Sequence, residues 1–340
     1  MGENKLSIIC RVGIAHNPLI ARVTDDLLSN AHQKFNSAHP TYYLLPKTKF
    51  DMSSPFYRVI KGNFVIIGKE PDGDSIRFIA EDPTLYQVLH RAYRIKLARD
   101  RSVQVRLEGI DAPETHYGKA TQPLGKDARD RLLSWIGFKN IKYKNNAVLE
   151  SEPSSIPGII LTKASDANGR PISYLLRDNS LTKDEEWVMI NDQILEQTAN
   201  YNLLSKGAAY YTVYTSTPFN HRQILRQVAA KAREKNLGVW EKDTTSEYRL
   251  ENPEDIGPNG QLILPKLFRR SVDYLKAVDS GFRGNLKDWL FDVSHFLSRQ
   301  ENDRVVIGDY LELHLSDLLD QRNRTVLFKA DLLNLTFVEK

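Results

Sequence analysis

One predicted strand, with the charged residues at its end, constrains this chain more than any other feature. Apolar and polar residues alternate over Ser102–Ile110, which is the two-residue period of a strand with one buried face. Arg106 lies within this run, and Asp111 and Glu114 follow it directly. The stretch therefore predicts a sheet whose strand end carries an arginine and two acids.

Two further stretches carry matching charges. Asp72-Gly73-Asp74 precedes a second predicted strand, and Arg170 follows the turn dipeptide Asn168-Gly169. A phosphodiester is anionic, and attack by water adds negative charge that guanidinium groups or a divalent cation can stabilise. Three acids with two arginines are therefore suited to cutting a phosphodiester.

The acids divide into ligands and a proton acceptor. Ca²⁺ prefers several oxygen ligands, which suits Asp74, Asp111 and the backbone carbonyl of Ala112. Glu114 lies three residues past Asp111, and Pro113 restricts the turn between them. Glu114 could hold the attacking water as general base, or could reach the metal through water.

Each stretch also has a purely structural interpretation. Gly73-Asp74 suits a hairpin turn, as does Asn168-Gly169. Asp111–Glu114 could begin a helix, with its acids at the positive end of the dipole.

Taken together, these residues resemble the staphylococcal nuclease family. The resemblance rests on Arg106–Glu114, on Gly73-Asp74 upstream and on Gly169-Arg170 downstream. The amphipathic run Arg226–Trp240 resembles the closing helix of that family and its terminal tryptophan. The match covers about residues 63–241.

The resemblance implies a role for each matching residue. Asp74 and Asp111 would bind Ca²⁺ together with the Ala112 carbonyl, with Asp72 behind them. Arg106, Glu114 and Arg170 would be catalytic; Glu114 would position the water. Tyrosines that contact the nucleotide would lie near Tyr210, Tyr211 or Tyr214, with Tyr211 and Tyr214 the candidates, although the register of that region is ambiguous.

The same resemblance implies an activity and a fold. The family hydrolyses DNA and RNA with Ca²⁺ and leaves 3′-phosphate ends, so we expect an endonuclease. The expected fold class is α+β, built on a five-stranded OB-fold barrel with helices. Strands are expected in this region at residues 63–68, 75–80, 102–110, 147–150, 158–162 and 171–177. Helices are expected at residues 127–136, 191–205 and 226–240. A basic insertion at residues 82–101 has helical spacing and is as consistent with a solvated face as with a nucleic-acid contact.

At 340 residues the chain is longer than one typical domain. We expect an N-terminal extension at residues 1–58, a nuclease domain at 59–243, a linker at 244–260 rich in turn signals, and a small C-terminal α+β domain at 261–340. If this last part packs onto the barrel instead, it would partly cover the nuclease site. It is a candidate for regulation, self-association or binding of a protein partner. Helices are expected near residues 267–278 and 286–297, with strands near 304–307, 310–315, 325–328 and 335–338.

The net charge of +4 gives a mild preference for polyanions such as DNA or RNA. Cys10 is the single cysteine, so an intramolecular disulfide is excluded. No apolar run reaches membrane-spanning length and no signal peptide is visible, so the expected location is cytoplasmic.

A different class of function also accounts for the sequence. A nuclease-like domain can lose activity and serve to bind nucleic acid or protein within a larger assembly. The retention of Asp74, Arg106, Asp111, Glu114 and Arg170 favours the enzyme.

Overall fold

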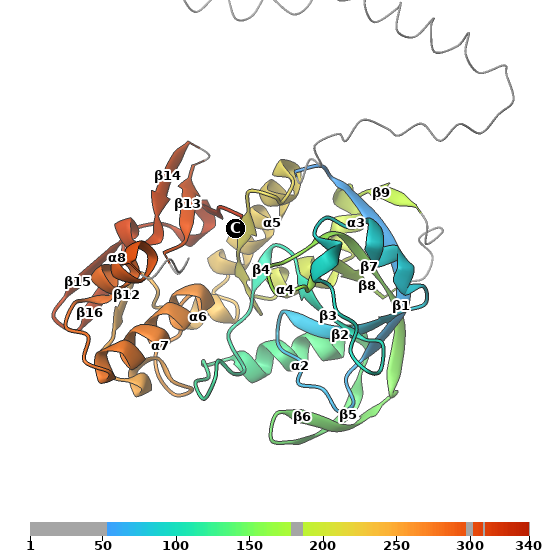
Figure 1. The fold of residues 1–340 in the computed structure, drawn as a ribbon, viewed down its shortest axis with the longest axis horizontal. Coiled ribbons are helices and arrows are strands. Elements are labelled where there is room, and N and C mark those ends of the chain that lie inside the picture. The colour runs from blue at the N-terminus through green and yellow to red at the C-terminus, as the bar shows by residue number, and fades with distance from the viewer. Residues whose placement is uncertain (1–52, 178–185, 297–301, 309, 340) are drawn as a thin grey trace, which may run out of the picture. The chain divides into compact units, whose positions relative to one another are not determined.

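The computed structural model describes residues 53–177, 186–296, 302–308 and 310–339 (Figure 1). Most of the N-terminal extension expected at residues 1–58 lies outside this described part. The chain from Phe50 onward forms one compact unit, which contains both the barrel and the C-terminal segment, residues 261–339.

The core of this unit is a closed barrel of five strands. β1 pairs with both β2 and β7, so the order β1-β2-β3-β8-β7 returns to β1. The pairing is antiparallel except between β3 and β8. These strands are β1 (Phe56–Val65), β2 (Ser75–Ala80), β3 (Val103–Leu107), β7 (Ser155–Ser165) and β8 (Pro171–Leu176), with β9 (Trp187–Met189) added beside the start of β1. The predicted five-stranded barrel is confirmed.

Two glycines face each other where the barrel closes. Gly62 of β1 lies opposite Gly158 of β7, and the same stretch of β1 also pairs with β2. A Cβ at Gly62 would lie 2.1 Å from the carbonyl oxygen of Ile79, and one at Gly158 would lie 2.4 Å from the ring of Phe64. Close approach of neighbouring backbone and ring atoms therefore requires glycine at both positions.

The helices beside the barrel differ from the predicted pattern in two places. The run expected at 226–240 ends its first helix at Glu234 and forms a second, short helix at Val239–Lys242, with Gly238 at a positive φ of 57° before it. The helix expected at 191–205 is two helices, because the Thr198 hydroxyl accepts from the Tyr201 N–H and starts a new helix there. The helices are α2 (Gly125–Ile136), α3 (Asp192–Glu196), α4 (Ala199–Ser205), α5 (Phe219–Glu234) and α6 (Val239–Lys242). Short paired strands complete this part: β4 (Ile110–Asp111), β5 (Lys139–Lys144), β6 (Ala147–Glu152), β10 (Tyr210–Tyr211) and β11 (Val213–Tyr214).

The insertion at residues 82–101 does not form the expected α-helix. It contains two 3-10 helices, η1 (Pro83–Val88) and η2 (Ala92–Arg94). Between them, Arg91 adopts a left-handed conformation with φ of 59°, and His90 forms a β-bridge with Ala164. The left-handed residue and the bridge interrupt a helix that the apolar spacing alone would allow.

The C-terminal segment is α+β, as predicted, and Figure 1 shows its two helices with a set of short strands. The helices are α7 (Pro265–Asp279) and α8 (Leu286–Phe296). The strands are β13 (Arg304–Ile307), β14 (Leu311–His314), β15 (Leu319–Arg322), β16 (Thr325–Phe328) and β17 (Leu335–Phe337), joined by η4 (Leu315–Leu318) and η5 (Leu332–Asn334). β15 was not predicted, because its residues Leu-Asp-Gln-Arg lack a clear alternation of apolar and polar side chains.

The stretch expected as a linker at 244–260 differs from that expectation. It contains β12 (Glu247–Arg249), which pairs with β16, and η3 (Pro253–Ile256). Tyr248 and Ile256 are buried, and Asn252 caps η3, so these turn signals belong to packed structure. β11 also pairs in parallel with β17, which joins the barrel part to the end of the C-terminal segment. None of the described helices combines the length and apolar character needed to cross a membrane.

Candidate active site

Asp74 lies directly before β2, next to the residue that pairs with Arg106 of β3. Ser75 pairs with Arg106, and the Leu107 N–H donates to the Asp74 carbonyl at 2.8 Å. The Nη1 atom of Arg106 lies 3.2 Å from Oδ2 of Asp74. Burial raises the pKa of the Asp74 carboxyl, and Arg106 opposes that rise.

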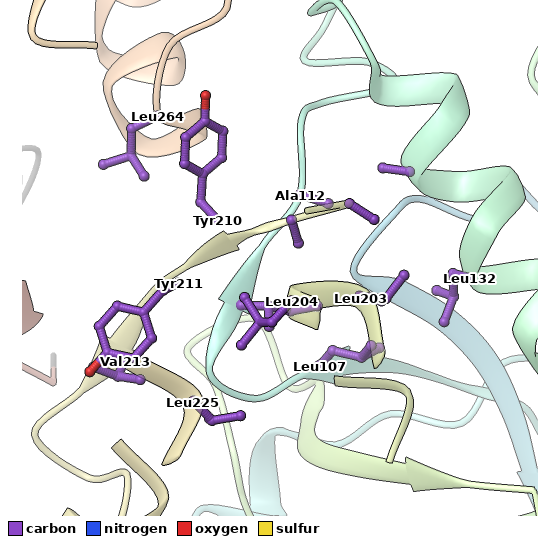
Figure 2. Packing of buried hydrophobic residues seen from close by; sticks show 14 of the residues in the cluster. Leu107, Ala112, Leu132, Leu203, Leu204, Tyr210, Tyr211, Val213, Leu225 and Leu264 are labelled. Carbon is purple, nitrogen blue, oxygen red and sulfur yellow. The ribbon is translucent and has the colours of Figure 1, made fainter. Parts of the chain in front are cut away.

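Gly73 is required by close approach rather than by a hairpin turn alone. A Cβ at Gly73 would lie 2.6 Å from the Cβ of Ala112 and 2.8 Å from that of Ala128. The loop that carries Asp74 therefore lies directly against Ala112 and the first turns of α2. Figure 2 shows Ala112 among packed side chains that include Leu132 of α2 and Leu203 of α4.

Asp111 is almost completely buried, with 1% of its surface exposed. It ends β4, where it pairs with Tyr210 of β10, and Nη2 of Arg106 donates to its Oδ1 at 3.1 Å. The Asp111–Glu114 stretch does not begin a helix, because α2 starts only at Gly125. Burial alone would raise the pKa of Asp111, but Arg269 and Arg106 hold it well below its usual range.

Glu114 is held by the loop that follows it. Its backbone N–H donates to Oε1 of Gln122 at 3.1 Å, and its carbonyl accepts from the Gln122 N–H at 3.0 Å. Burial raises the pKa of the Glu114 carboxyl to about 7, although Arg269 opposes this. Asp111 contributes to the rise, because a second negative charge nearby disfavours ionisation.

Arg170 and Asp72 are positioned by hydrogen bonds to neighbouring loop residues. Nε of Arg170 donates to Oδ2 of Asp166 at 2.7 Å, while Oδ1 of Asp166 accepts from the backbone N–H groups of Asn168 and Arg170. Asp72 accepts from the Gly73 N–H at 2.8 Å and from the Thr115 N–H at 3.3 Å. Asp72 therefore ties the loop of Asp74 to the loop of Glu114, and Asp166 fixes the direction of Arg170.

The two tyrosines expected near the substrate lie in different surroundings. Tyr211 is 2% exposed and pairs with Ile110. Figure 2 shows its side chain among buried hydrophobic residues that include Val213 and Leu225. Tyr214 lines a cavity on the surface of the barrel, and its hydroxyl accepts a hydrogen bond from Nζ of Lys266 at 3.1 Å. Of the two, Tyr214 has the accessible position that contact with a nucleotide requires.

One cavity of about 830 Å³ collects most of the predicted site. Its walls include Asp72, Asp74, Arg106, Glu114 and Arg170, with Asp111 buried against Arg106. Three stretches that are distant in sequence, around Asp74, Arg106–Glu114 and Arg170, therefore meet at one hollow on the barrel.

Three cavity-lining cations come from α7 and were not predicted. They are Lys266, Arg269 and Arg270. Nη2 of Arg269 lies 2.9 Å from Oδ2 of Asp111, and Nη1 forms an ion pair with Oε1 of Glu114. The available sequence signal was the basic cluster in an otherwise amphipathic helix, but its position over the barrel depends on the tertiary fold.

The chemistry of the site suits a hard divalent cation. Asp74 and Asp111 are buried carboxylates that share one guanidinium, and oxygen donors of this kind are what Ca²⁺ prefers. In the described part of the chain, no group of three or more His, Cys, Asp or Glu residues has the geometry of a metal site. In this structure, guanidinium groups supply the positive charge that the acids need.

Comparison with known proteins agrees with the site. Residues 104–242 match the staphylococcal nuclease homologue family. A probable endonuclease of Schizosaccharomyces pombe is 29% identical over 103 residues, which cover 29% of this chain and 45% of the relative. A probable endonuclease of Aspergillus flavus is 23% identical over 162 residues, covering 46% of this chain and 50% of the relative. A probable endonuclease of Komagataella phaffii is 26% identical over 124 residues, which cover 32% of this chain and 50% of the relative.

This chain thus spans about half the length of the curated relatives that it matches. The matched residues contain Arg106, Asp111, Glu114 and Arg170, and they carry three strands of the closed barrel, β3, β7 and β8. Over residues 104 to 242, this chain is thus similar to the staphylococcal nuclease homologue family.

Proposed function

We propose that this protein is a Ca²⁺-dependent endonuclease that hydrolyses phosphodiester bonds of DNA or RNA. The observation that carries the proposal is the convergence of Asp74, Arg106, Glu114 and Arg170 on one cavity, with Asp111 ion-paired to Arg106. The relatives named as probable endonucleases support it at the level of the family. A cytoplasmic location remains a prediction.

Asp74, Asp111 and the Ala112 carbonyl would hold the cation, with Asp72 supporting the Asp74 loop. Bound Ca²⁺ would supply positive charge to the phosphate oxygens and help to orient water. In this proposal, buried oxygen atoms bind the cation, and side chains that line the cavity bind the reacting phosphate.

Glu114 would take the proton from the attacking water. Its pKa of about 7 would place it near the optimum for a general base at neutral pH. The water oxygen would form a bond to phosphorus while the bond to the 5′-oxygen breaks. The departing oxygen would take up a proton, which leaves a 5′-hydroxyl and a 3′-phosphate.

Arg106 and Arg170 would bind the phosphate from two sides. Arg106 is held by Asp74 and Asp111, and Arg170 is held by Asp166. Arginines whose directions are already set can stabilise charge in the transition state with little reorganisation. Tyr214 is the proposed nucleotide contact that lines the cavity, and Tyr211 would support it from the core.

The test is digestion of a labelled oligonucleotide by the full chain. Cutting is expected with Ca²⁺ and should stop with EDTA. Asp111→Asn should abolish it, and Arg170→Ala should lower turnover by at least ~10²-fold while affinity for the substrate stays near that of wild type. Asp279→Asn, at the exposed C-terminal end of α7, is the control and should cut normally. Undiminished cutting by both site variants would refute the proposed residues.

A nuclease-like module that only binds nucleic acid or protein is the second candidate. The ion pairs of Arg269 with Asp111 and Glu114 favour it, because they hold the proposed metal ligand and base in another interaction. Oligonucleotide binding without cutting, across a range of Ca²⁺ concentrations, would select this alternative.

A further inference from the structure

The guanidinium of Arg269 contacts the same acids that the proposed function assigns to the cation and the water. Nη2 lies 2.9 Å from Oδ2 of Asp111, and Nη1 lies 3.4 Å from Oδ1 of the same carboxylate. Nη1 also donates to Oε1 of Glu114. Since Arg106 donates to Oδ1 of Asp111 at 3.1 Å, both carboxylate oxygens of Asp111 accept from guanidinium groups.

The helix that carries Arg269 is fixed to the Glu114 loop. Nε2 of Gln122 donates to the Ile263 carbonyl at 2.7 Å, just before α7 begins, while Oε1 of Gln122 accepts from the Glu114 N–H. Further along α7, the Tyr117 hydroxyl donates to Oδ2 of Asp273 at 2.6 Å. Arg269 is therefore held at the site by one hydrogen bond before it in the chain, to the Ile263 carbonyl, and one after it, to the Asp273 side chain.

The neighbouring cations of α7 have a different partner. Lys266 and Arg270 both form ion pairs with Asp303 of the C-terminal segment, at 3.6 and 3.0 Å. Lys266 also donates to the Tyr214 hydroxyl. Among these three helix cations of the described chain, Arg269 is the one whose ion pairs reach the acids of the barrel.

Electrostatics explains why a cation is needed at this position. Asp74, Asp111 and Glu114 are three acids in little contact with water. Arg106 pairs with Asp74 and Asp111, but its one positive charge cannot offset three carboxylates. Leaving buried carboxylates uncompensated is costly. A second positive charge on Asp111 and Glu114 can come from Arg269 or from a divalent cation, but the two repel each other and need the same oxygen atoms.

We propose that Arg269 is an internal counter-ion of the metal site, which competes with the divalent cation for Asp111 and Glu114. The proposal rests on the cation site of the proposed function. It makes the C-terminal segment a part of the active site, where it sets the Ca²⁺ concentration at which the acids become available.

The experiment measures Ca²⁺ binding directly, by titration calorimetry of the full chain without nucleic acid. Arg269→Met keeps the length of the side chain and removes its charge. It should bind Ca²⁺ about 5- to 100-fold more tightly than wild type, the usual range of coupling between two binding events. Without Ca²⁺ this variant should melt at a lower temperature than wild type, and Ca²⁺ should raise its melting temperature by more.

Two further variants isolate the competition. Lys276→Met removes another cation from α7, one that pairs with Asp273, and should leave the affinity for Ca²⁺ unchanged. Arg269→Lys keeps the charge but loses the planar fork, so its affinity for Ca²⁺ should lie between those of wild type and Arg269→Met. If Arg269→Met does not fold, the tighter binding of Arg269→Lys relative to wild type decides the question.

The outcomes separate this proposal from the proposed function. If wild type cuts with Ca²⁺ but the Arg269 variants bind Ca²⁺ no more tightly, the competition is refuted while the nuclease stands. If they bind Ca²⁺ as wild type does and also cut more slowly, Arg269 contacts the substrate instead, and the proposal is equally overturned. If no form binds Ca²⁺ or cuts, the cation site itself is refuted.

Discussion

The barrel and the C-terminal segment each place one arginine on Asp111, but the two arginines differ in origin. Arg106 lies on β3, five positions before Asp111 in the chain, and also contacts Asp74. Arg269 lies on α7, 158 positions away, and also contacts Glu114. Asp111 therefore binds one arginine that is close to it in the sequence and one that reaches it only because a distant helix packs nearby.

This difference teaches that similar contacts can have different functional meanings. Arg106 is part of the strand that builds the site, and its other partner is the second proposed ligand. Arg269 belongs to a segment outside the matched residues 104–242. The barrel supplies a site of the kind expected for nucleases, and the C-terminal segment adds a cation that this expectation does not include.

The largest expected effect is the loss of the barrel arginine. Arg106→Met should lower turnover by ~10²- to 10³-fold, the scale of removing one donor to developing negative charge. Raising the Ca²⁺ concentration should not restore turnover, because a metal on the acids does not replace the lost contact to the phosphate. Steady-state kinetics over a series of Ca²⁺ concentrations measures this, with exposed Arg304→Met as the control. Full recovery at high Ca²⁺ would mean that the two arginines have the same role.

The next effect concerns the packing that holds α7. Leu267 is fully buried, so Leu267→Ala should lower the free energy of unfolding by about 3 kcal/mol. Leu311 is 54% exposed, and Leu311→Ala should change this free energy by less than ~0.5 kcal/mol. Urea unfolding followed by tryptophan fluorescence and by circular dichroism measures both. A separate early transition in Leu267→Ala would show that the C-terminal segment unfolds independently of the barrel.

The loss of stability at acid pH can come from a buried histidine beside the barrel or from the carboxylates of the site. His221 is buried; its Nε2 lies 3.0 Å from the Ile190 carbonyl and its Nδ1 lies 3.2 Å from the Tyr174 hydroxyl, which suits a neutral ring. Burial lowers the pKa of His221 to about 4. Because the unfolded chain holds this proton more tightly, the stabilising contribution is complete above the ordinary pKa of about 6.5 and is lost as the pH falls through about 4.

The measurement compares the free energy of unfolding at pH 7 and pH 4.5 for wild type and His221→Gln. The decrease on acidification should be smaller in the variant, which has no imidazole to protonate. An equal decrease in both proteins would assign the acid sensitivity to carboxylates such as those paired with Arg106 and Arg269.

The smallest expected effect is on proteolysis of residues 244–260. Since β12 pairs with β16 and Tyr248 and Ile256 are buried, a protease should cut this stretch no faster than the barrel itself. Limited proteolysis with mass spectrometry of the fragments measures this. Rapid release of a stable C-terminal fragment would contradict the single compact unit and would show that residues 244–260 behave as a linker.

Local patterns in the sequence were sufficient for the barrel and for most elements of the C-terminal segment. The alternation over residues 102–110 predicted β3, and apolar spacing predicted α2 and α7. These patterns work because each element must bury one face, whatever its neighbours are. The resemblance then assigned Asp74, Arg106, Glu114 and Arg170, which do line one cavity.

Other features depended on neighbours that the sequence does not reveal. The helix expected in the insertion is interrupted at Arg91, and the turn signals around Asn252 belong to η3 rather than to a linker. In each case the local signal was real, but tertiary contacts decided what it formed. Burial also distinguished Tyr211 from Tyr214, which their positions three residues apart in the sequence could not do.

The sequence by itself predicted the strands that carry or flank Asp74, Arg106 and Arg170, because these strands have a clear period, and the resemblance to the nuclease family indicated which of their charged residues would lie together. Only the tertiary structure decided that Arg269 joins them, because an ion pair across 158 positions exists only when α7 packs against the Glu114 loop. Periodicity reports which face of an element is buried. It does not report which other element covers that face, and this choice of neighbour is what places a second guanidinium on Asp111.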